Sequence, residues 1–364
     1  MPQTQQQQQP SRTFNVAVVG YGFAGRSFHS YLAPLAPGLN LYAIAVRDPA
    51  KQARARQERT GAIVVDSFEQ VIADPAVDLV VLGTPHDTHA PLAVAALDAG
   101  KHVVTDKVMC LDLSECERMT AAARRNDRLL TVFHNRRWDG DFLTLQTLIA
   151  AGRLGEVRWV EMAWQKYGVW GGWRATIEKG GGRTFDLGAH LLDQLLLLFP
   201  EPVAHVYARM HRDWPGAPTE SHATITLAFE GGRTAVCDVG SMTRWPKPRV
   251  HAIGTEATFV KHGVDPQEPA MIAGDIDAAR EDPAAYGKLY TGHAKTGHEE
   301  SPVPTTPGRW RCFYENVAQV LSTWGRPDAV APAVTLDEMR RLMAVLDAAF
   351  ESARTGLAVR PAHG

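Results

Sequence analysis

Residues 14–25 have the sequence FNVAVVGYGFAG, and this stretch decides the first fold prediction. The apolar run Phe14–Val19 is short and ends at a glycine, which indicates a buried β-strand. A GxGxxG loop follows at once, and residues 24–33 are predicted to form a helix. A strand, a glycine loop and a helix in this order are typical of the first turn of a parallel, doubly wound sheet.

The glycines of this loop predict a dinucleotide site. In such a loop the first glycine makes a tight turn, the second lets the backbone approach a pyrophosphate, and the third lets helix and strand pack closely. The free N–H groups and positive dipole end of the following helix then face the phosphates. We therefore expect a dinucleotide to contact Gly20, Gly22, Phe23, Ala24 and Gly25. The alternative is a glycine turn in a doubly wound domain that has lost its cofactor.

Strands and helices alternate from residue 13 to residue 133. Five further strands are predicted after the first, at residues 41–46, 62–65, 79–82, 102–105 and 129–133. Helical segments separate them, so the chain repeats one strand–helix unit. This alternation predicts an α/β domain with a doubly wound parallel sheet.

The pattern changes after residue 134, where the predicted strands become longer. They are predicted at residues 157–165, 203–209, 219–229 and 233–241. A partly irregular segment is predicted over 263–308, and closing helices near 310–323 and 336–353. This pattern indicates an α+β domain on a largely antiparallel open sheet. The predicted division is a disordered, glutamine-rich arm over 1–12, a dinucleotide-binding domain over 13–133 and an α+β domain over 134–364.

The composition argues against several classes of protein. The 364 residues include 38 Lys and Arg against 40 Asp and Glu, so the formal net charge is −2. A nucleic-acid binder usually shows a basic balance or a basic stripe, and the sequence shows neither. No apolar run approaches the roughly 18 residues that a membrane span needs. The four cysteines include no CxxC pair, which favours a reduced, cytoplasmic protein.

The end of the second predicted strand bears on the choice between NAD and NADP. Pro49 suits the first position of a helix and Asp48 suits its N-cap, so Asp48 is not the preferred partner of the ribose hydroxyls. Arg47 can stack on adenine and pair with a 2′-phosphate. We therefore favour NADP, with NAD as the alternative. A solvated surface arginine is the other interpretation of Arg47.

Four more segments follow the glycine loop in a fixed order. They have the sequences GTPHDTH at 83–89, DK at 106–107, HNRRWD at 134–139 and GGGRTFDLGAH at 180–190. Together with the glycine loop, this order resembles the Gfo/Idh/MocA family of NAD(P)-dependent oxidoreductases over nearly the whole chain after residue 12. Within the family it is most similar to the branch that contains NADP-dependent scyllo-inositol 2-dehydrogenase.

The resemblance implies roles for individual residues. The family's Glu-Lys-Pro motif supplies a lysine at the nicotinamide and the substrate hydroxyl, and its counterpart here is Asp106-Lys107-Val108, without the proline. The family's Asp-x-x-x-His pair corresponds to Asp186 and His190. Cofactor contacts are expected for Thr84, Pro85, His86, His89, Asp106, Lys107 and Asn135.

These residue types suit the oxidation of a secondary alcohol, which needs a hydride acceptor and a base. Lys107 follows a parallel strand at its carboxyl end, where ligands bind, and burial would lower its pKa. Asp186 and His190 stand four apart on a helix predicted over 184–199, so they share one face, and histidine suits acid–base work near neutrality. The alternatives are a surface lysine paired with Asp106, a capping aspartate and a structural histidine.

The loop over residues 167–174 carries candidate substrate contacts. Trp173 offers an aromatic plane to a sugar ring or to the nicotinamide. Tyr167 and Arg174 could bind hydroxyl groups. A loop that merely fills the core is the other interpretation of the tryptophans in this segment.

We expect hydride transfer between NADP, or NAD, and a cyclic polyol or sugar, with an inositol-like substrate favoured. The expected partners are this small molecule and copies of the same chain, as a homodimer or homotetramer, with no nucleic acid and no membrane. No metal is expected, because no cysteine joins the zinc-like pair His86 and His89. The alternatives are another substrate (an aldose, a dihydrodiol or a linear tetrapyrrole) and an NADP-binding sensor without catalysis.

Overall fold

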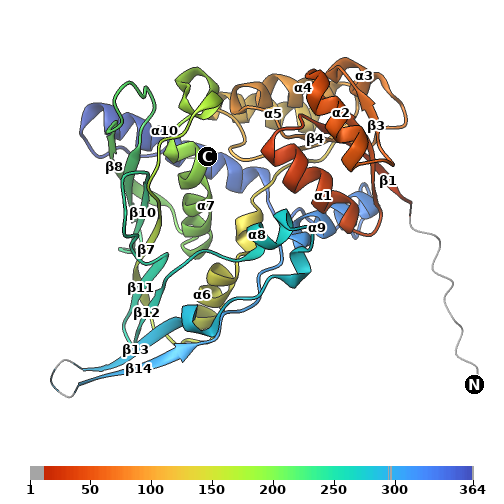
Figure 1. Cartoon of the computed structure of the whole chain (residues 1–364). Coiled ribbons are helices and arrows are strands. Elements are labelled where there is room, and N and C mark those ends of the chain that lie inside the picture. Colours follow the sequence, from red (N-terminus) through yellow and green to blue (C-terminus); the bar gives the residue numbers. More distant parts are fainter. Residues whose placement is uncertain (1–11, 294, 296, 363–364) are drawn as a thin grey trace, which may run out of the picture.

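The computed structural model describes residues 12–293, 295 and 297–362 (Figure 1). Six strands form a parallel sheet in the order β3-β2-β1-β4-β5-β6. They are β1 (Phe14–Val19), β2 (Leu39–Ala45), β3 (Ile63–Val65), β4 (Leu79–Leu82), β5 (His102–Thr105) and β6 (Leu130–Val132). The predicted parallel sheet is confirmed. Of the predicted arm over 1–12, only Arg12 lies within the described residues, and its guanidinium pairs with Asp78 at 2.5 Å.

Helices flank this first sheet and leave its central strands buried. They are α1 (Ser30–Leu32), α2 (Pro49–Glu58), α3 (Phe68–Ala73), α4 (His89–Asp98) and α5 (Leu113–Arg125). Every residue of β4 is buried, as expected for a parallel strand covered on both faces. Asp48 caps α2, because its carboxylate accepts hydrogen bonds from the N–H groups of Ala50 and Lys51. A π-helical segment, Ala24–His29, leads from the glycine loop into α1.

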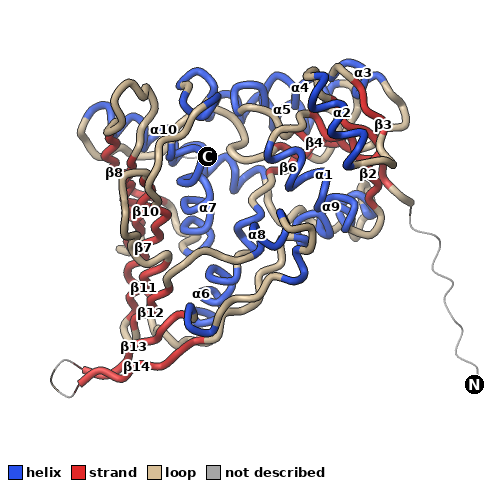
Figure 2. Tube along the Cα trace, viewed as in Figure 1, coloured by secondary structure: helices blue, strands red, loops and turns tan. Residues whose placement is uncertain are grey.

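A second sheet has eight strands in the order β14-β13-β12-β11-β7-β10-β9-β8 (Figure 2). They are β7 (Val157–Gln165), β8 (Val203–His211), β9 (His222–Phe229), β10 (Thr234–Gly240), β11 (Val250–Gly254), β12 (Thr258–Lys261), β13 (Gly287–His293) and β14 (Gly297–Val303). Neighbours are antiparallel except for β7 and β10. The predicted, largely antiparallel sheet is therefore confirmed.

Four strands of the second sheet, β11 to β14, were not predicted. The segment over 263–308 is more regular than expected, because it contains α8 (Gln267–Ile272) and the antiparallel hairpin of β13 and β14. Six of the seven residues of β14 are exposed and the seventh is half-buried. No apolar alternation therefore marks this strand in the sequence.

The second sheet is covered by helices on one face. Figure 1 shows α6 (Gly140–Ala150) and α7 (Ala189–Leu198) along that face, and α10 (Leu336–Thr355) contacts both β8 and α5. Alternate residues of β9 are buried, from Ala223 to Phe229. This alternation is the pattern of a sheet with one face on the core.

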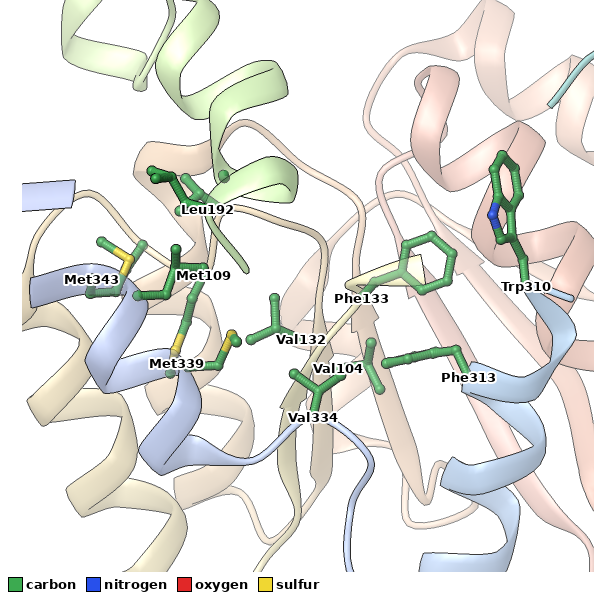
Figure 3. Close-up of a cluster of buried hydrophobic side chains, with 14 of the residues drawn as sticks. Val104, Met109, Val132, Phe133, Leu192, Trp310, Phe313, Val334, Met339 and Met343 are labelled. Atoms are coloured by element: carbon green, nitrogen blue, oxygen red, sulfur yellow. The ribbon is translucent and has the colours of Figure 1, made fainter. Parts of the chain in front are cut away.

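The closing helices also pack against the first sheet. Figure 3 shows Phe313 of α9 (Arg311–Thr323) beside Phe133, and the two ring centroids lie 5.0 Å apart. The hydroxyl of Thr131 in β6 donates to the carbonyl oxygen of Val334 at 2.8 Å. Residues beyond 133 therefore complete the packing of the first sheet, and the predicted domain boundary stays a prediction.

Candidate active site

The glycine loop after β1 has space for a ligand at its second glycine. A Cβ at Gly22 would meet no atom within 4 Å. Gly20 has a φ of 93°, which favours glycine, and a Cβ there would lie 2.5 Å from the carbonyl oxygen of Gly83. A Cβ at Gly25 would collide with the carbonyl oxygen of Gly20. The first and third glycines thus serve the turn and the packing, and Gly22 leaves room for a pyrophosphate.

A cavity of about 350 Å³ opens on this loop, and we call it the first cavity. Arg47, just before α2, and Lys51, in the first turn of α2, border it, and neither forms an ion pair with another described residue. Most of the predicted cofactor residues line it, namely Gly20, Gly22, Phe23, Ala24, Arg47, Thr84, Pro85, His86, Asp106 and Lys107. Because they follow the carboxyl ends of parallel strands, this cavity lies where such sheets bind dinucleotides.

A second cavity, of about 520 Å³, adjoins the first. The two cavities share the lining residues Phe23, Ala24, Asp106, Lys107 and Arg174. Asp186 and His190 line the second cavity, as does Tyr167, whereas Trp173 lines the first. The predicted catalytic and substrate residues thus meet around two joined spaces.

Lys107 lies at the junction of the two cavities, in the loop after β5. Its Nζ lies 3.5 Å from the carboxylate of Asp186 and donates a hydrogen bond to the backbone carbonyl oxygen of the same residue. Burial lowers the pKa of Lys107 from its usual 10.5, as expected from the sequence. The peptide bond between Lys107 and Val108, where the family motif has proline, is cis.

Asp186 lies among three cationic side chains. It belongs to a π-helical segment, Thr184–Gly188, that leads into α7. Besides Lys107, its carboxylate contacts Arg174 Nε at 3.2 Å and Arg183 Nη1 at 3.4 Å. Burial alone would raise the pKa of Asp186, but these three cations lower it overall. Asp186 is therefore ionised and holds Lys107 and Arg174 in place.

His190 lines the second cavity in a buried position. Its side chain is 6% exposed, and its Nδ1 has no hydrogen-bond partner. Burial, together with the charges of Lys107 and Arg136, holds the pKa of His190 well below 6.5. The expected titration near neutrality is therefore wrong, and the imidazole is neutral at pH 7. In that form it can donate or accept a hydrogen bond to a substrate hydroxyl.

Asp106 supports the loop that carries Lys107. One carboxylate oxygen accepts a hydrogen bond from the Lys107 N–H at 2.8 Å, and the other lies 3.8 Å from His29 Nε2. The other ring nitrogen of His29 lies 2.8 Å from the hydroxyl of Tyr314 in α9. Helix α9 therefore contacts the loop of Lys107 through His29 and Asp106.

The two histidines of the loop after β4 occupy different places. His86 lines the first cavity, and its Nδ1 lies 2.9 Å from the carbonyl oxygen of Gly180. His89 is fully buried and lines neither cavity. Its ring nitrogens face the carbonyl oxygens of Val108 and Thr84 at 2.8 and 3.0 Å. His89 thus connects two loops and does not line the first cavity, although the sequence predicts a cofactor contact for it.

Two further predicted cofactor residues lie away from the first cavity. Gly25 packs beneath the loop, as its contact with Gly20 shows. Asn135 lines the second cavity instead, and its Nδ2 is buried without a hydrogen-bond partner.

In the described part of the chain, no three His, Cys, Asp or Glu residues form a metal-binding group. Across the same residues, no helix has the length and apolarity for a membrane span.

Comparison with known proteins identifies the family. The model of the oxidoreductase family with an NAD-binding Rossmann fold matches residues 14–134, and that of the GFO/IDH/MocA C-terminal domain matches residues 142–260. The scyllo-inositol 2-dehydrogenase (NADP(+)) IolW of Bacillus subtilis is 33% identical over 348 residues, which cover 94% of each chain. The chain belongs to the Gfo/Idh/MocA family. It is therefore an oxidoreductase with an NAD-binding Rossmann domain.

Other members of the Gfo/Idh/MocA family match in sequence and in structure. A solved structure of the oxidoreductase yvaA of Bacillus subtilis matches with a TM-score of 0.89 at 30% identity, and covers 98% of this chain and 100% of that one. The 1-carboxy-3-chloro-3,4-dihydroxycyclo hexa-1,5-diene dehydrogenase of Comamonas testosteroni is 32% identical over 201 residues, or 54% of this chain and 50% of that enzyme. The resemblance predicted from the sequence is thus confirmed.

Several side chains of the second cavity were not predicted from the sequence. Arg136 stacks between Trp164 and Trp310, with its guanidinium 4.5 and 4.7 Å from the two ring centroids. It also pairs with Glu268 at 2.6 Å. Arg136 belongs to the Gfo/Idh/MocA-like segment at 134–139, so that motif could have indicated it. Glu268 lies in the segment predicted as irregular, where no sequence signal marks it.

Proposed function

We propose that this oxidoreductase transfers a hydride between NADP and a CH–OH group of a cyclic polyol or sugar, with an inositol-like ring favoured. The position of Lys107 is the observation that supports this best, because it borders both the cavity on the glycine loop and the second cavity. A base at that junction can reach the hydroxyl of a substrate whose C–H bond points toward the cofactor.

In this proposal Lys107 is the base for the hydroxyl proton. Bound NADP⁺ supplies the hydride acceptor. Burial lowers the pKa of Lys107, so its ammonium gives up a proton more readily than that of a free lysine, and the resulting amine takes the hydroxyl proton as the hydride leaves the carbon that carries the hydroxyl. The new ammonium lies 3.5 Å from the carboxylate of Asp186, which stabilises its charge. The alcohol loses a hydride and a proton and becomes a ketone, and in reverse Lys107 returns the proton to the carbonyl oxygen.

Asp186 and His190 are proposed to position the substrate ring. Asp186 holds Lys107 and Arg174 at contact distance, and its ionised carboxylate can accept hydrogen bonds from ring hydroxyls. Neutral His190 can serve as donor or acceptor to a neighbouring hydroxyl. A polyol with several adjacent hydroxyls suits this mixture of donors and acceptors. The inositol preference also draws on the printed activity of the IolW relative.

The substrate class is tested by a panel followed at 340 nm with NADP⁺. The panel holds inositols, aldoses and a dihydrodiol, with a linear tetrapyrrole tested for reduction by NADPH. We expect turnover of a cyclic polyol or sugar. Turnover of the dihydrodiol alone would instead favour an activity like that of the Comamonas testosteroni relative. Tight NADPH binding without turnover of any compound would favour a sensor.

Larger stabilisation by NADPH than by NADH is expected, because Arg47 and Lys51 offer two unpaired cations beside the first cavity. A 2′-phosphate suits such cations. A ligand at 100 times its Kd raises the unfolding free energy by about 2.7 kcal/mol, so a thermal melt separates the two cofactors. The variant Arg47→Ala is expected to lose most of the difference. If NADPH and NADH raise the Tm of the wild-type protein equally, the proposed preference for NADP is contradicted.

We propose that the chain forms a homodimer or homotetramer through the second sheet. Tyr207 of β8 and Ile253 of β11 remain 42% and 38% exposed, and large apolar side chains left exposed on a sheet often belong to an interface. Light scattering at micromolar protein is expected to give two or four times the chain mass of 39.8 kDa, and the mass of one chain would contradict it.

The buried free thiols Cys110, Cys116 and Cys237 suit a reducing compartment such as the cytoplasm.

A further inference from the structure

The second cavity carries more basic than acidic side chains. Five basic residues line it: Lys107, Arg136, Lys166, Arg174 and Arg183. Three acidic residues line it: Asp106, Asp186 and Glu268. A neutral polyol would leave this excess of positive charge uncompensated inside a concave, partly desolvated space, where charges interact more strongly than in water.

The carboxylates of the cavity already have partners. Asp186 is shared among three cations, as described above. Glu268 pairs with Arg136 at 2.6 Å, and Asp106 accepts from the Lys107 backbone and faces His29. None of these acids lies within ion-pair distance of Lys166. Lys166 is therefore the one basic residue of this lining that pairs with no described carboxylate.

Lys166 is the basic residue of the second cavity that has no ion-pair partner among the described residues. It follows the last residue of β7 and lines the second cavity but not the first. Its ammonium has no ion pair and no hydrogen bond to any residue in the described part of the chain. Desolvation and the charge of Arg183 lower the pKa of Lys166 from its usual 10.5, and they outweigh the charges of Asp186 and Glu268, which raise it. An anion beside Lys166 would instead favour the ammonium.

Three buried hydrogen-bond donors of the same cavity also lack acceptors. They are the Nδ2 of Asn135, the Nε of Arg136 and the Nε of Arg183, and these residues are 2%, 4% and 2% exposed. Buried donors in proteins are nearly always paired. Arg183 also stacks on the ring of Trp170, which lines the cavity, with its guanidinium 3.0 Å from the ring centroid. The cavity thus offers positive charge and unpaired hydrogen-bond donors to an anionic group of a ligand.

We propose that the substrate is an acidic polyol or sugar whose carboxylate or phosphate is bound by Lys166 and Arg183 while its CH–OH group reacts beside Lys107. This inference rests on the proposed hydride transfer and adds the charge of the substrate to it. Lys166 and Arg183 line only the second cavity, whereas Lys107 also borders the first, so the anionic group stands apart from the reacting carbon. A volume of about 520 Å³ accommodates a six-membered ring with such a substituent.

The test compares neutral and acidic members of matched series on the NADP⁺-loaded protein. The probes are glucose, glucuronate and glucose 6-phosphate, with myo-inositol and inositol 1-phosphate as the cyclic pair. Binding is measured by calorimetry and turnover at 340 nm. At least one acid is expected to bind about tenfold or more tightly than its neutral parent. A preference for glucuronate identifies a carboxylate site, and a preference for either phosphate ester identifies a phosphate site.

The variant Lys166→Met tests the residue itself. It is expected to weaken binding of the acid about tenfold, to raise the KM of the acid more than it lowers kcat, and to weaken binding of the neutral parent far less. The matched control is Lys179→Met, which removes an exposed lysine that lines neither cavity and is expected to keep the preference. Equal weakening of acidic and neutral ligands by Lys166→Met would overturn the proposed role of this residue.

The outcomes separate this inference from the proposed hydride transfer. Binding of an acid without turnover of any probe supports the acidic substrate and counts against hydride transfer. Turnover of a neutral parent that binds as tightly as its acids overturns the acidic substrate and supports hydride transfer. The absence of binding by every probe overturns the acidic substrate as well.

Discussion

Replacing Lys107 by methionine is expected to lower kcat for polyol oxidation by at least about 10²-fold, because the base for the hydroxyl proton is lost. Methionine suits the site sterically, since the Lys107 side chain is only 13% exposed and the two side chains have similar length. Asp186 keeps contacts with Arg174 and Arg183 at 3.2 and 3.4 Å, so its buried carboxylate is not left unpaired. The fold and the cofactor affinity should therefore survive.

Measurements on Lys107→Met and on the wild-type protein separate the loss of the base from a loss of structure. NADPH affinity, measured by fluorescence titration, should stay near that of the wild type. The wild-type rate of oxidation should rise with pH as the amine loses its proton, and level off above a Lys107 pKa that burial holds below 10.5. The residual rate of the variant should lack this rise. A variant with wild-type kcat would show that Lys107 is not the base.

Replacing Gly22 by valine is expected to weaken NADPH binding by about 10- to 100-fold while the protein stays folded. A Cβ at Gly22 would meet no protein atom within 4 Å, and its φ lies outside the left-handed region, so valine costs the apo protein little. The added methyl groups would instead occupy the space through which a pyrophosphate approaches the backbone. The effect should therefore appear in the Kd for NADPH and not in the Tm of the free protein.

Gly61→Val is the matched control for this substitution. Gly61 is exposed, has no atom within 4 Å of its ideal Cβ, and lies outside the first cavity. Titration of both variants with NADPH, and melts without ligand, should show a loss of affinity for Gly22→Val alone. If both variants bind NADPH like the wild type, the glycine loop does not hold the pyrophosphate.

The first sheet was predictable because its strands are short, apolar and separated by helices. β4 and β5 have the predicted bounds, and Asp48 caps α2 as its position before Pro49 suggests. The second sheet was predictable only where burial alternates along the strand, as in β9. β14 is held in place by pairing with β13 and has little burial of its own, so local sequence carries no signal for it.

The positions of the candidate site residues were predictable where a sequence motif or the spacing of neighbouring residues indicates them. The positions of Lys107 at a strand end and of Asp186 near His190 follow from the sequence alone. The neutral state of His190 does not, because its pKa depends on burial and on cations from distant segments. The pairing of Arg136 with Glu268 joins residues 132 positions apart, and spacing predicts no such contact.

The most direct test of the proposed function is the transfer of deuterium from substrate to cofactor. The protein is incubated with NADP⁺ and an inositol or sugar acid that carries deuterium at each ring CH–OH carbon, and the cofactor is analysed by mass spectrometry. Wild-type protein is expected to yield NADPH that carries one deuterium, and Lys107→Met to yield at least about 10²-fold less in the same time. Cofactor that remains free of deuterium with every substrate of the panel, in a protein that binds NADPH, would contradict hydride transfer from a CH–OH group.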